Sequence, residues 1–246
     1  MEKNTQRFAS LFRGLNTAYG TFEITGQSVN GKATGKAQIL REPRTSKTFA
    51  DHLSGRRGVG IVPISEENTC RWGAIDIDLY PLDHGRLLQT IKKLKFPLVV
   101  CRSKSGGSHV YLFLKKPVAA EKLQNKLKEI AAELGYSANT EIFPKQTVLV
   151  LERGDVGNFL NLPYFNAETG LRYAFLEDGT AATLEEFLTL AEGSAITEEE
   201  LDALATSAEP EIDGRLKNGP PCLQTLMRQG FPEGTRNNGL FNVGVY

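Results

Sequence analysis

The stretch Trp72-Gly73-Ala74-Ile75-Asp76-Ile77-Asp78-Leu79 combines the alternation of a β-strand with two carboxylates. Residues i and i+2 of a strand point to the same face, so Asp76 and Asp78 face one way while the odd-numbered residues from 75 to 79 face the core. Two carboxylates on one face repel each other unless a cation lies between them, and hard divalent ions such as Mg²⁺ or Mn²⁺ prefer oxygen ligands. Two solvated acids on an exposed edge strand would give the same pattern, but the apolar flanks favour a central strand.

A second polar segment, Arg102-Ser103-Lys104-Ser105-Gly106-Gly107-Ser108-His109, lies between strands predicted over 97–102 and 109–114. Its Gly pair frees backbone N–H groups to form an anion nest, and further donors come from two hydroxyls and three cationic side chains: Ser105, Ser108, Arg102, Lys104 and His109. These are the groups that a triphosphate requires. A plain hairpin turn also explains Gly-Gly between apolar runs, but it needs neither Lys104 nor His109.

Glu141 is the next acidic candidate along the chain. It lies in a short apolar strand predicted over 140–143, where an unpaired carboxylate is costly, so it needs a cation, a metal or an exposed edge. Lys145 and Gln146 follow directly and are weaker candidates for nucleotide or template contact. Residues 157–164 then alternate amide and apolar side chains, which fits either the ordering of a nucleotide or the closing of a strand.

The stretch Gly26-Gln27-Ser28-Val29-Asn30-Gly31-Lys32-Ala33 nearly matches the spacing of a P-loop. Ala33 replaces the Ser or Thr that would bind Mg²⁺, and no helix is predicted after it. We therefore interpret this stretch as a hairpin turn.

Around these segments, hydrophobic periodicity predicts alternating helices and strands. Helices are expected behind a cap at Asn4 or Thr5, from a cap at Ser46 through 53, after Asp83, and over 119–134, 184–191 and 198–204. Strands are expected within 19–40, at 58–63 and 72–79 joined by a polar turn, and at 147–151 and 159–164. This order predicts an α+β (mixed α/β) core up to about Asp178, followed by a small helical tail.

Composition narrows the class of protein. The 246 residues are 40% apolar and 24% charged, which excludes collagen-like, low-complexity and fully disordered chains. No signal peptide or membrane-spanning stretch is found, and three widely spaced cysteines without a CxxC pair argue for a reducing cytoplasm. The net charge of zero hides an asymmetry: residues 1–150 hold 23 basic and 13 acidic side chains, whereas 151–213 hold 2 and 15. The basic part favours a polyanionic partner.

Taken together, these segments resemble the archaeo-eukaryotic primase superfamily, in particular the primase-polymerase branch of phage and plasmid replication proteins and of conflict or CRISPR-associated systems. The resemblance runs, in order, through residues 53–55, 59–63, 68–70, 74–78, 102–109, 141–146 and 158–164. This ordered combination is more specific than any single motif. Residues 220–223 and 234–238 also look like the helical segment that follows such domains, often ahead of a helicase.

The resemblance implies a catalytic core in which an N-terminal α/β part and an RRM-like sheet face each other across the active site. It implies Asp76 and Asp78 as the first metal-binding motif and Glu141 as the third acidic ligand, together holding two Mg²⁺ or Mn²⁺ ions. No zinc-binding Cys/His module is visible in the sequence, so no zinc is expected.

The family's triphosphate-binding motif corresponds to Lys104, Ser105 and His109. In one respect this sequence departs from the family pattern, which has Ser two residues before His. Gly107 occupies that place here and Ser108 is adjacent to His109, so the serine that touches phosphate is left open.

We therefore expect a template-directed DNA primase-polymerase that transfers nucleotides from NTP or dNTP to a 3′-hydroxyl, with Asp76, Asp78, Glu141 and His109 as catalytic residues. Nucleotide contacts are expected from Arg102, Lys104, Ser105, Gly106, Gly107, Ser108, His109, Lys145 and Gln146. The expected partners are a single-stranded DNA template, a primer and a fused or associated helicase, with no membrane. A metal-dependent nuclease and a non-catalytic single-strand binder remain as alternatives.

The expected domains are a catalytic core over 1–180 and a helical C-terminal segment over 181–246. The chain ends on Leu240, Phe241, Val243 and Val245, an apolar pattern that favours a piece cut from a longer protein. The expected setting is the cytoplasm of a bacterial, phage-infected or plasmid-bearing host.

Overall fold

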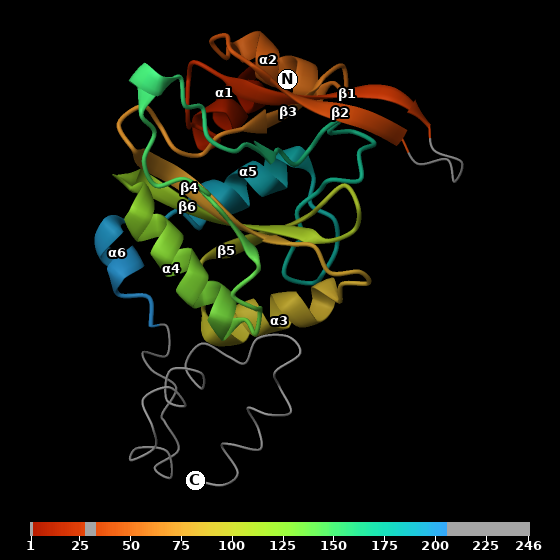
Figure 1. Cartoon of the computed structure of the whole chain (residues 1–246). Coiled ribbons are helices and arrows are strands. Elements are labelled where there is room, and N and C mark those ends of the chain that lie inside the picture. The colour runs from red at the N-terminus through yellow and green to blue at the C-terminus, as the bar shows by residue number, and fades with distance from the viewer. Residues whose placement is uncertain (1, 28–32, 206–246) are drawn as a thin grey trace, which may run out of the picture.

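The computed structural model describes residues 2–27 and 33–205 and contains two four-stranded sheets (Figure 1). The first has the strand order β2-β1-β3-β8 and the second β5-β6-β4-β7, and every paired strand is antiparallel. The strands are β1 Tyr19–Gln27, β2 Ala33–Leu40, β3 Gly58–Ile61, β4 Thr69–Ile77, β5 Leu98–Arg102, β6 Ser108–Ala119, β7 Glu141–Phe143 and β8 Leu160–Asn161.

The described residues form the α-helices α1 Glu2–Leu11, α2 Ser46–Leu53, α3 His84–Leu94, α4 Ala120–Glu133, α5 Leu184–Gly193 and α6 Glu198–Asp202, and the 3₁₀-helix η1 Leu151–Arg153. Sheets and helices of this kind confirm the mixed α/β fold that the sequence predicts. The turn expected at 26–33 lies largely outside the described residues, but the strand ends on either side of it, Gln27 and Ala33, are antiparallel partners.

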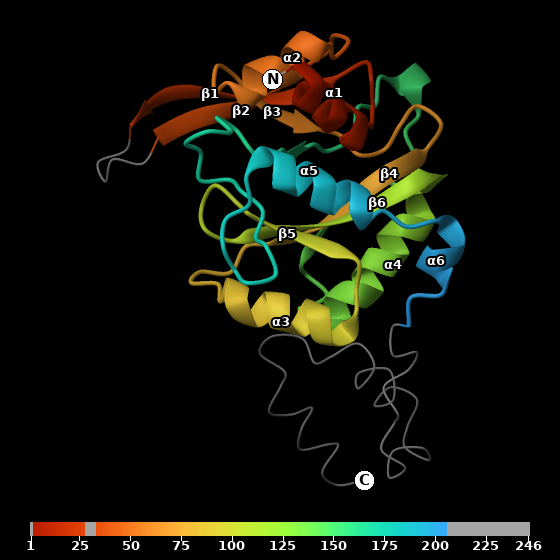
Figure 2. The same cartoon turned by 180° about the vertical axis from the view of Figure 1, so that it is seen from behind.

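The second sheet separates two hydrophobic clusters. Ile75 and Ile77 of β4 lie in the cluster that contains the apolar residues of α3 and α4. Trp72 and Ala74 lie in the other cluster, with aromatic residues of α1 and α5 and with strands of the first sheet. Figures 1 and 2 show α3 and α4 below this sheet and α5 between the two sheets. Strand alternation thus assigns each face of β4 its own neighbours.

Local signals set the helix boundaries. Asp83 caps α3 by accepting a hydrogen bond from the backbone N–H of Arg86 at 2.9 Å, as predicted. Gly135, just beyond α4, has φ +84°, the left-handed conformation that ends a helix. The predicted caps at Asn4 or Thr5 and at Ser46 are wrong, because α1 already includes residue 2 and the N-cap of α2 is Thr45.

Three further predictions differ from the structure. The strands at 58–63 and 72–79 do not pair, because β3 and β4 belong to different sheets. Residues 147–151 form no strand: Val148 is 60% exposed and η1 follows. Leu79 does not face the core, because β4 ends at Ile77 and the Leu79 side chain is 54% exposed.

The acidic helices pack onto the rest of the structure through ion pairs. Glu192 of α5 pairs with Arg7 of α1 at 2.8 Å, and fully buried Phe187 of α5 joins the aromatic cluster. Glu198 and Asp202 of α6 both bind Lys122 of α4, at 2.7 and 2.8 Å. A boundary at residue 180 stays a prediction, as do the expectations for residues 220–246, which lie outside the described residues. In the described part of the chain, no helix is long and apolar enough to cross a membrane.

Candidate active site

Three of the predicted site residues form one row across the second sheet. Asp76 of β4 is the register partner of Glu141 on β7 and of His109 on β6. Directly opposite residues of antiparallel strands share a face, so Asp76, Glu141 and His109 belong to one face, and Asp78, just beyond the end of β4, lies near enough for its charge to act on Asp76. We call this face the carboxylate face. It continues the face of Trp72 and Ala74, which packs on the aromatic cluster.

The carboxylate of Asp76 lies at the centre of this row and lacks a neutralising partner. Its Oδ1 is buried without a hydrogen bond, and the nearest ring nitrogen, Nε2 of His109, lies 3.5 Å away. Burial, followed by the negative charges of Asp78 and Glu141, raises the pKa of Asp76 to about 7. An ionised carboxylate in this position is stabilised by a cation brought in from solvent.

The other two carboxylates each have a partner within the chain. Glu141 pairs with Lys145 at 2.7 Å, and the Tyr80 hydroxyl donates to Oδ1 of Asp78 at 2.7 Å. Among residues 2–27 and 33–205, no three His, Cys, Asp or Glu side chains are grouped closely enough to hold a metal ion. The three acids nevertheless line one open pocket of about 320 Å³, which residues 135–137, 139 and 140 after α4 also line.

His109 is a neutral side chain at physiological pH. Burial, followed by the positive charge of Arg172, lowers its pKa to about 4. The imidazole contacts the Tyr111 hydroxyl through Nδ1 at 3.2 Å and hydrogen-bonds the backbone of Asn161. In the chain alone, His109 is therefore neutral rather than the cationic donor expected from the sequence, because burial and the charge of Arg172 outweigh the attraction of Asp78. Its role toward a nucleotide stays a prediction.

The loop between β5 and β6 is a tight turn against the end of β4. Ser103 N–H donates to the Gly107 carbonyl at 2.9 Å, and Gly106 has φ +98°. A Cβ at Gly107 would lie 2.2 Å from the carbonyl oxygen of Ile77, so no side chain fits there. This contact explains why glycine stands where the family pattern has serine.

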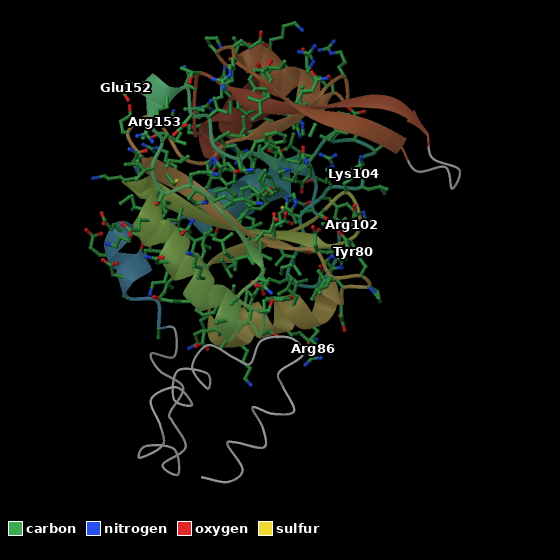
Figure 3. The ribbon with its side chains drawn as sticks, in the orientation of Figure 1. Tyr80, Arg86, Arg102, Lys104, Glu152 and Arg153 are labelled. Carbon is green, nitrogen blue, oxygen red and sulfur yellow. The ribbon has the colours of Figure 1, made fainter. Side chains whose placement is uncertain are left out.

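The remaining residues of this loop divide between the two faces. Ser108 is the partner of Ile77, one residue from His109, so it belongs to the opposite face, where its Oγ is buried without a hydrogen bond. Arg102 donates to the Leu171 carbonyl at 3.2 Å. Figure 3 shows Lys104, Arg102 and Tyr80 along one side of the molecule, with Glu152 and Arg153 on the other. Of the two candidate serines, Ser105 is the one connected to the carboxylates, through Tyr80.

The segment after β7 is hydrogen-bonded to the amide-rich stretch at residues 157–164. Gln146 exchanges two hydrogen bonds with Asn158: its Nε2 donates to Oδ1 at 2.5 Å, and its Oε1 accepts from the backbone N–H at 2.8 Å. Lys145 lies 5.1 Å above the ring centre of Phe143. Lys145 thus adjoins the carboxylates, whereas the amide of Gln146 is already engaged.

Arg172 and His84 are residues that sequence reasoning missed. The Arg172 guanidinium packs 5.5 Å from the Phe165 ring centre, and its one hydrogen bond, to the Leu162 carbonyl, is long at 3.4 Å. Burial lowers its pKa, and its charge acts on His109. His84 Nε2 lies 3.3 Å from the Gly107 carbonyl. A single Arg or His outside any motif gives no sequence signal, because only the fold brings it to the site.

Comparison with known proteins places the chain in the archaeo-eukaryotic primase superfamily. The family model described as "TOTE conflict system, Archaeo-Eukaryotic Primase domain" matches residues 17–204, and the chain belongs to this family. The family relationship confirms the resemblance that the motifs indicated and makes the chain a member of a nucleotidyltransferase-like family whose primase-polymerases generally use divalent metals.

Among solved structures, the chain is similar to the archaeo-eukaryotic primase domain (PP-N190) of the cyanophage S-2L primase-polymerase. The two are 12% identical, with a TM-score of 0.41, over 78% of this chain and 98% of that one. No curated protein matches the sequence.

Proposed function

We propose that this chain is a template-directed primase-polymerase that transfers nucleotides from NTP or dNTP to a 3′-hydroxyl. The observation that carries the proposal is that Asp76, Asp78 and Glu141 line one pocket, in which Oδ1 of buried Asp76 has no hydrogen-bond partner among the described residues. The turn between β5 and β6, with the exposed side chains of Lys104 and Ser105, adjoins the end of β4. Acids to hold cations, next to donors for phosphate, are the parts that phosphoryl chemistry needs.

The residues present fit a divalent cation. The donor set is carboxylate oxygen, which Mg²⁺ and Mn²⁺ prefer, and the orphaned Oδ1 of Asp76 lacks only a positive partner. Asp76, Asp78 and Glu141 would hold the ions. When bound, two such ions lower the pKa of the attacking hydroxyl and stabilise the pyrophosphate leaving group. To bind an ion, Glu141 would give up its ion pair with Lys145. Breaking that pair costs little free energy because both side chains are partly exposed.

The triphosphate would be held by groups on both sides of His109. The Arg172 guanidinium would offer donors from the buried side, and Lys104 and Ser105 would offer them from the loop. His109, Gly106 and Gly107 would contact the nucleotide only by exchanging present partners, since His109 bonds the Asn161 backbone and the Gly106 N–H donates to the Ser103 carbonyl. Arg172 suits this role because its guanidinium is half-buried and, among the described residues, makes a single, long hydrogen bond. Ser105 fits better than Ser108, which belongs to the opposite face.

The proposed partners are a single-stranded DNA template with its primer and a fused or associated helicase. Basic residues of the first 150 positions would follow template phosphates, so binding should weaken steeply as salt is added.

The test is primer synthesis and extension on single-stranded DNA with Mg²⁺ or Mn²⁺, comparing wild type with Asp76→Ala/Asp78→Ala. Incorporation of labelled nucleotide by wild type alone supports the proposal. Equal product from both proteins refutes it. Strand cleavage without incorporation would establish the nuclease, and full DNA affinity in EDTA without either activity would establish the passive binder.

A further inference from the structure

Tyr80 is an exposed aromatic residue whose hydroxyl is held within the site. The side chain lies three residues beyond β4 and is 54% exposed, yet its O–H donates to Oδ1 of Asp78 at 2.7 Å. An exposed phenol needs no protein partner, because water satisfies it, and holding the ring in one orientation costs side-chain entropy. The main effect of this hydrogen bond is therefore to orient the Asp78 carboxylate and not to satisfy the Tyr80 hydroxyl.

The same hydroxyl also lies beside the glycine turn. The Ser105 side chain lies near enough to lower the pKa of the Tyr80 hydroxyl, so this phenol lies between the carboxylate just beyond β4 and the loop between β5 and β6. Tyr80 and Arg102, the residue that begins this loop, lie on the same side of the molecule (Figure 3). The strand that precedes Asp78 and the end of this loop are also joined by the β4–β6 ladder, in which Ile77 pairs with Ser108.

We propose that Tyr80 is a positioning residue that orients the Asp78 carboxylate for its cation and connects this carboxylate to the triphosphate loop. The inference rests on the proposed function, since it assigns Asp78 to the cation and Ser105 to the nucleotide. With the Tyr80 O–H on Oδ1, the Asp78 carboxylate keeps a fixed orientation and directs its other oxygen away from the phenol. Groups that orient a metal ligand in this way are typically worth about tenfold in metal affinity.

The experiment measures Mn²⁺ binding without any substrate, by following the free-ion signal in electron paramagnetic resonance as Mn²⁺ is added. Tyr80→Phe removes only the hydroxyl, and we expect about tenfold weaker Mn²⁺ binding. Tyr19→Phe is the matched control, because the Tyr19 hydroxyl also donates to a carboxylate, that of Glu42. Tyr19 begins β1 and Glu42 follows β2, so this pair belongs to the first sheet and not to the carboxylate pocket. Tyr19→Phe should therefore bind Mn²⁺ as wild type does.

Ser105→Ala tests the connection itself. We expect about threefold weaker Mn²⁺ binding when Ser105→Ala is made in wild type, and no further loss when it is made in Tyr80→Phe, because coupled residues are non-additive. In nucleotide addition, Tyr80→Phe should lower kcat more than it raises the KM for nucleotide. A change confined to thermal stability would be the mark of a merely structural role and would overturn the inference.

The outcomes separate this inference from the proposed function. If wild type binds no Mn²⁺, the cation site and with it the proposed function fail. If wild type binds Mn²⁺ and Tyr80→Phe binds it equally well or more tightly, the positioning role of Tyr80 fails alone. Equal losses from Ser105→Ala in both backgrounds would overturn the connection to the loop.

Discussion

Asp76 and Glu141 are directly opposite partners on β4 and β7, two carboxylates facing each other across one antiparallel ladder. Like charges in that position destabilise a sheet. A Lys–Glu pair or two apolar residues would hold these strands together better. The acids therefore lower the stability of the cation-free protein.

Removing the charge of Asp76 should stabilise the cation-free protein. The pKa of this carboxyl is higher in the folded chain, about 7, than its ordinary 3.8, so ionisation favours unfolding as pH rises between these values. In EDTA at pH 8, Asp76→Asn should raise the free energy of unfolding by up to about 4 kcal/mol, measured by urea denaturation. Mn²⁺ should stabilise wild type and leave the variant unchanged. A variant less stable than wild type in EDTA would contradict the prediction.

Freeing Glu141 from Lys145 should improve cation binding. The Lys145 ammonium lies 2.7 Å from the Glu141 carboxylate. Because the Lys145 side chain is 32% exposed and that of Glu141 is 53% exposed, this ion pair contributes less than about 1 kcal/mol to stability. Lys145→Gln should therefore tighten Mn²⁺ binding about twofold, measured by calorimetry. Lys47→Gln, which breaks a surface pair with Asp51, is the control. Weaker Mn²⁺ binding by Lys145→Gln would count against Glu141 as a ligand.

A side chain at position 107 should damage the glycine turn. The Cβ of Gly107→Ala would lie 2.2 Å from the Ile77 carbonyl oxygen, so either the turn or the end of β4 must move. We expect a stability loss of about 2 kcal/mol and nucleotide binding weakened by about tenfold or more. Gly193→Ala is the control, because a Cβ there meets nothing within 4 Å. Wild-type nucleotide affinity in Gly107→Ala would contradict the assignment of the loop.

Replacing Arg172 should weaken nucleotide binding and spare the cation. Its guanidinium is half-buried, so truncation removes a desolvated positive charge next to His109. We expect Arg172→Gln to bind ATP about tenfold more weakly, since a charge-assisted hydrogen bond is worth about 1.5 kcal/mol. Mn²⁺ affinity without nucleotide should not fall. Arg7→Gln, in the pair with Glu192, is the control, and unchanged ATP affinity in Arg172→Gln would remove Arg172 from the site.

Acid should destabilise the fold through His52, which is away from the carboxylates. Its Nδ1 accepts from Val59 N–H at 3.0 Å, so Nε2 carries the proton and donates to the Pro163 carbonyl at 2.7 Å. Burial lowers the pKa of this imidazole from 6.5 to about 4. Its stabilising effect is complete above pH 6.5 and declines by about 3 kcal/mol as pH falls to 4.

The variant His52→Gln tests this dependence. It should be less stable at pH 7, because it loses hydrogen bonds, but its free energy of unfolding should fall less steeply between pH 6.5 and 4. Urea denaturation at several pH values measures both slopes. Parallel slopes would show that His52 does not titrate on unfolding.

The sequence was sufficient to predict features that depend on near neighbours. Alternation predicts that Asp76 and Asp78 line the same site, and Asp83 and Gly135 predict the limits of α3 and α4. It was insufficient where tertiary pairing decides: β3 and β4 look like a hairpin yet join different sheets. The charge state of His109 depends on burial and on Arg172, neither of which has a local pattern. The role of Gly107 needed the position of Ile77.

Trp72, the single tryptophan of the chain, lies on the same face of β4 as Asp76. It is fully buried, its indole N–H donates to the Arg13 carbonyl at 2.7 Å, and the Phe12 ring packs edge-on at 5.3 Å. Its fluorescence should therefore be blue-shifted in the folded chain and move to longer wavelength when this strand is exposed to water. The protein thus contains its own optical reporter, with no label added to the strand whose stability the acids control.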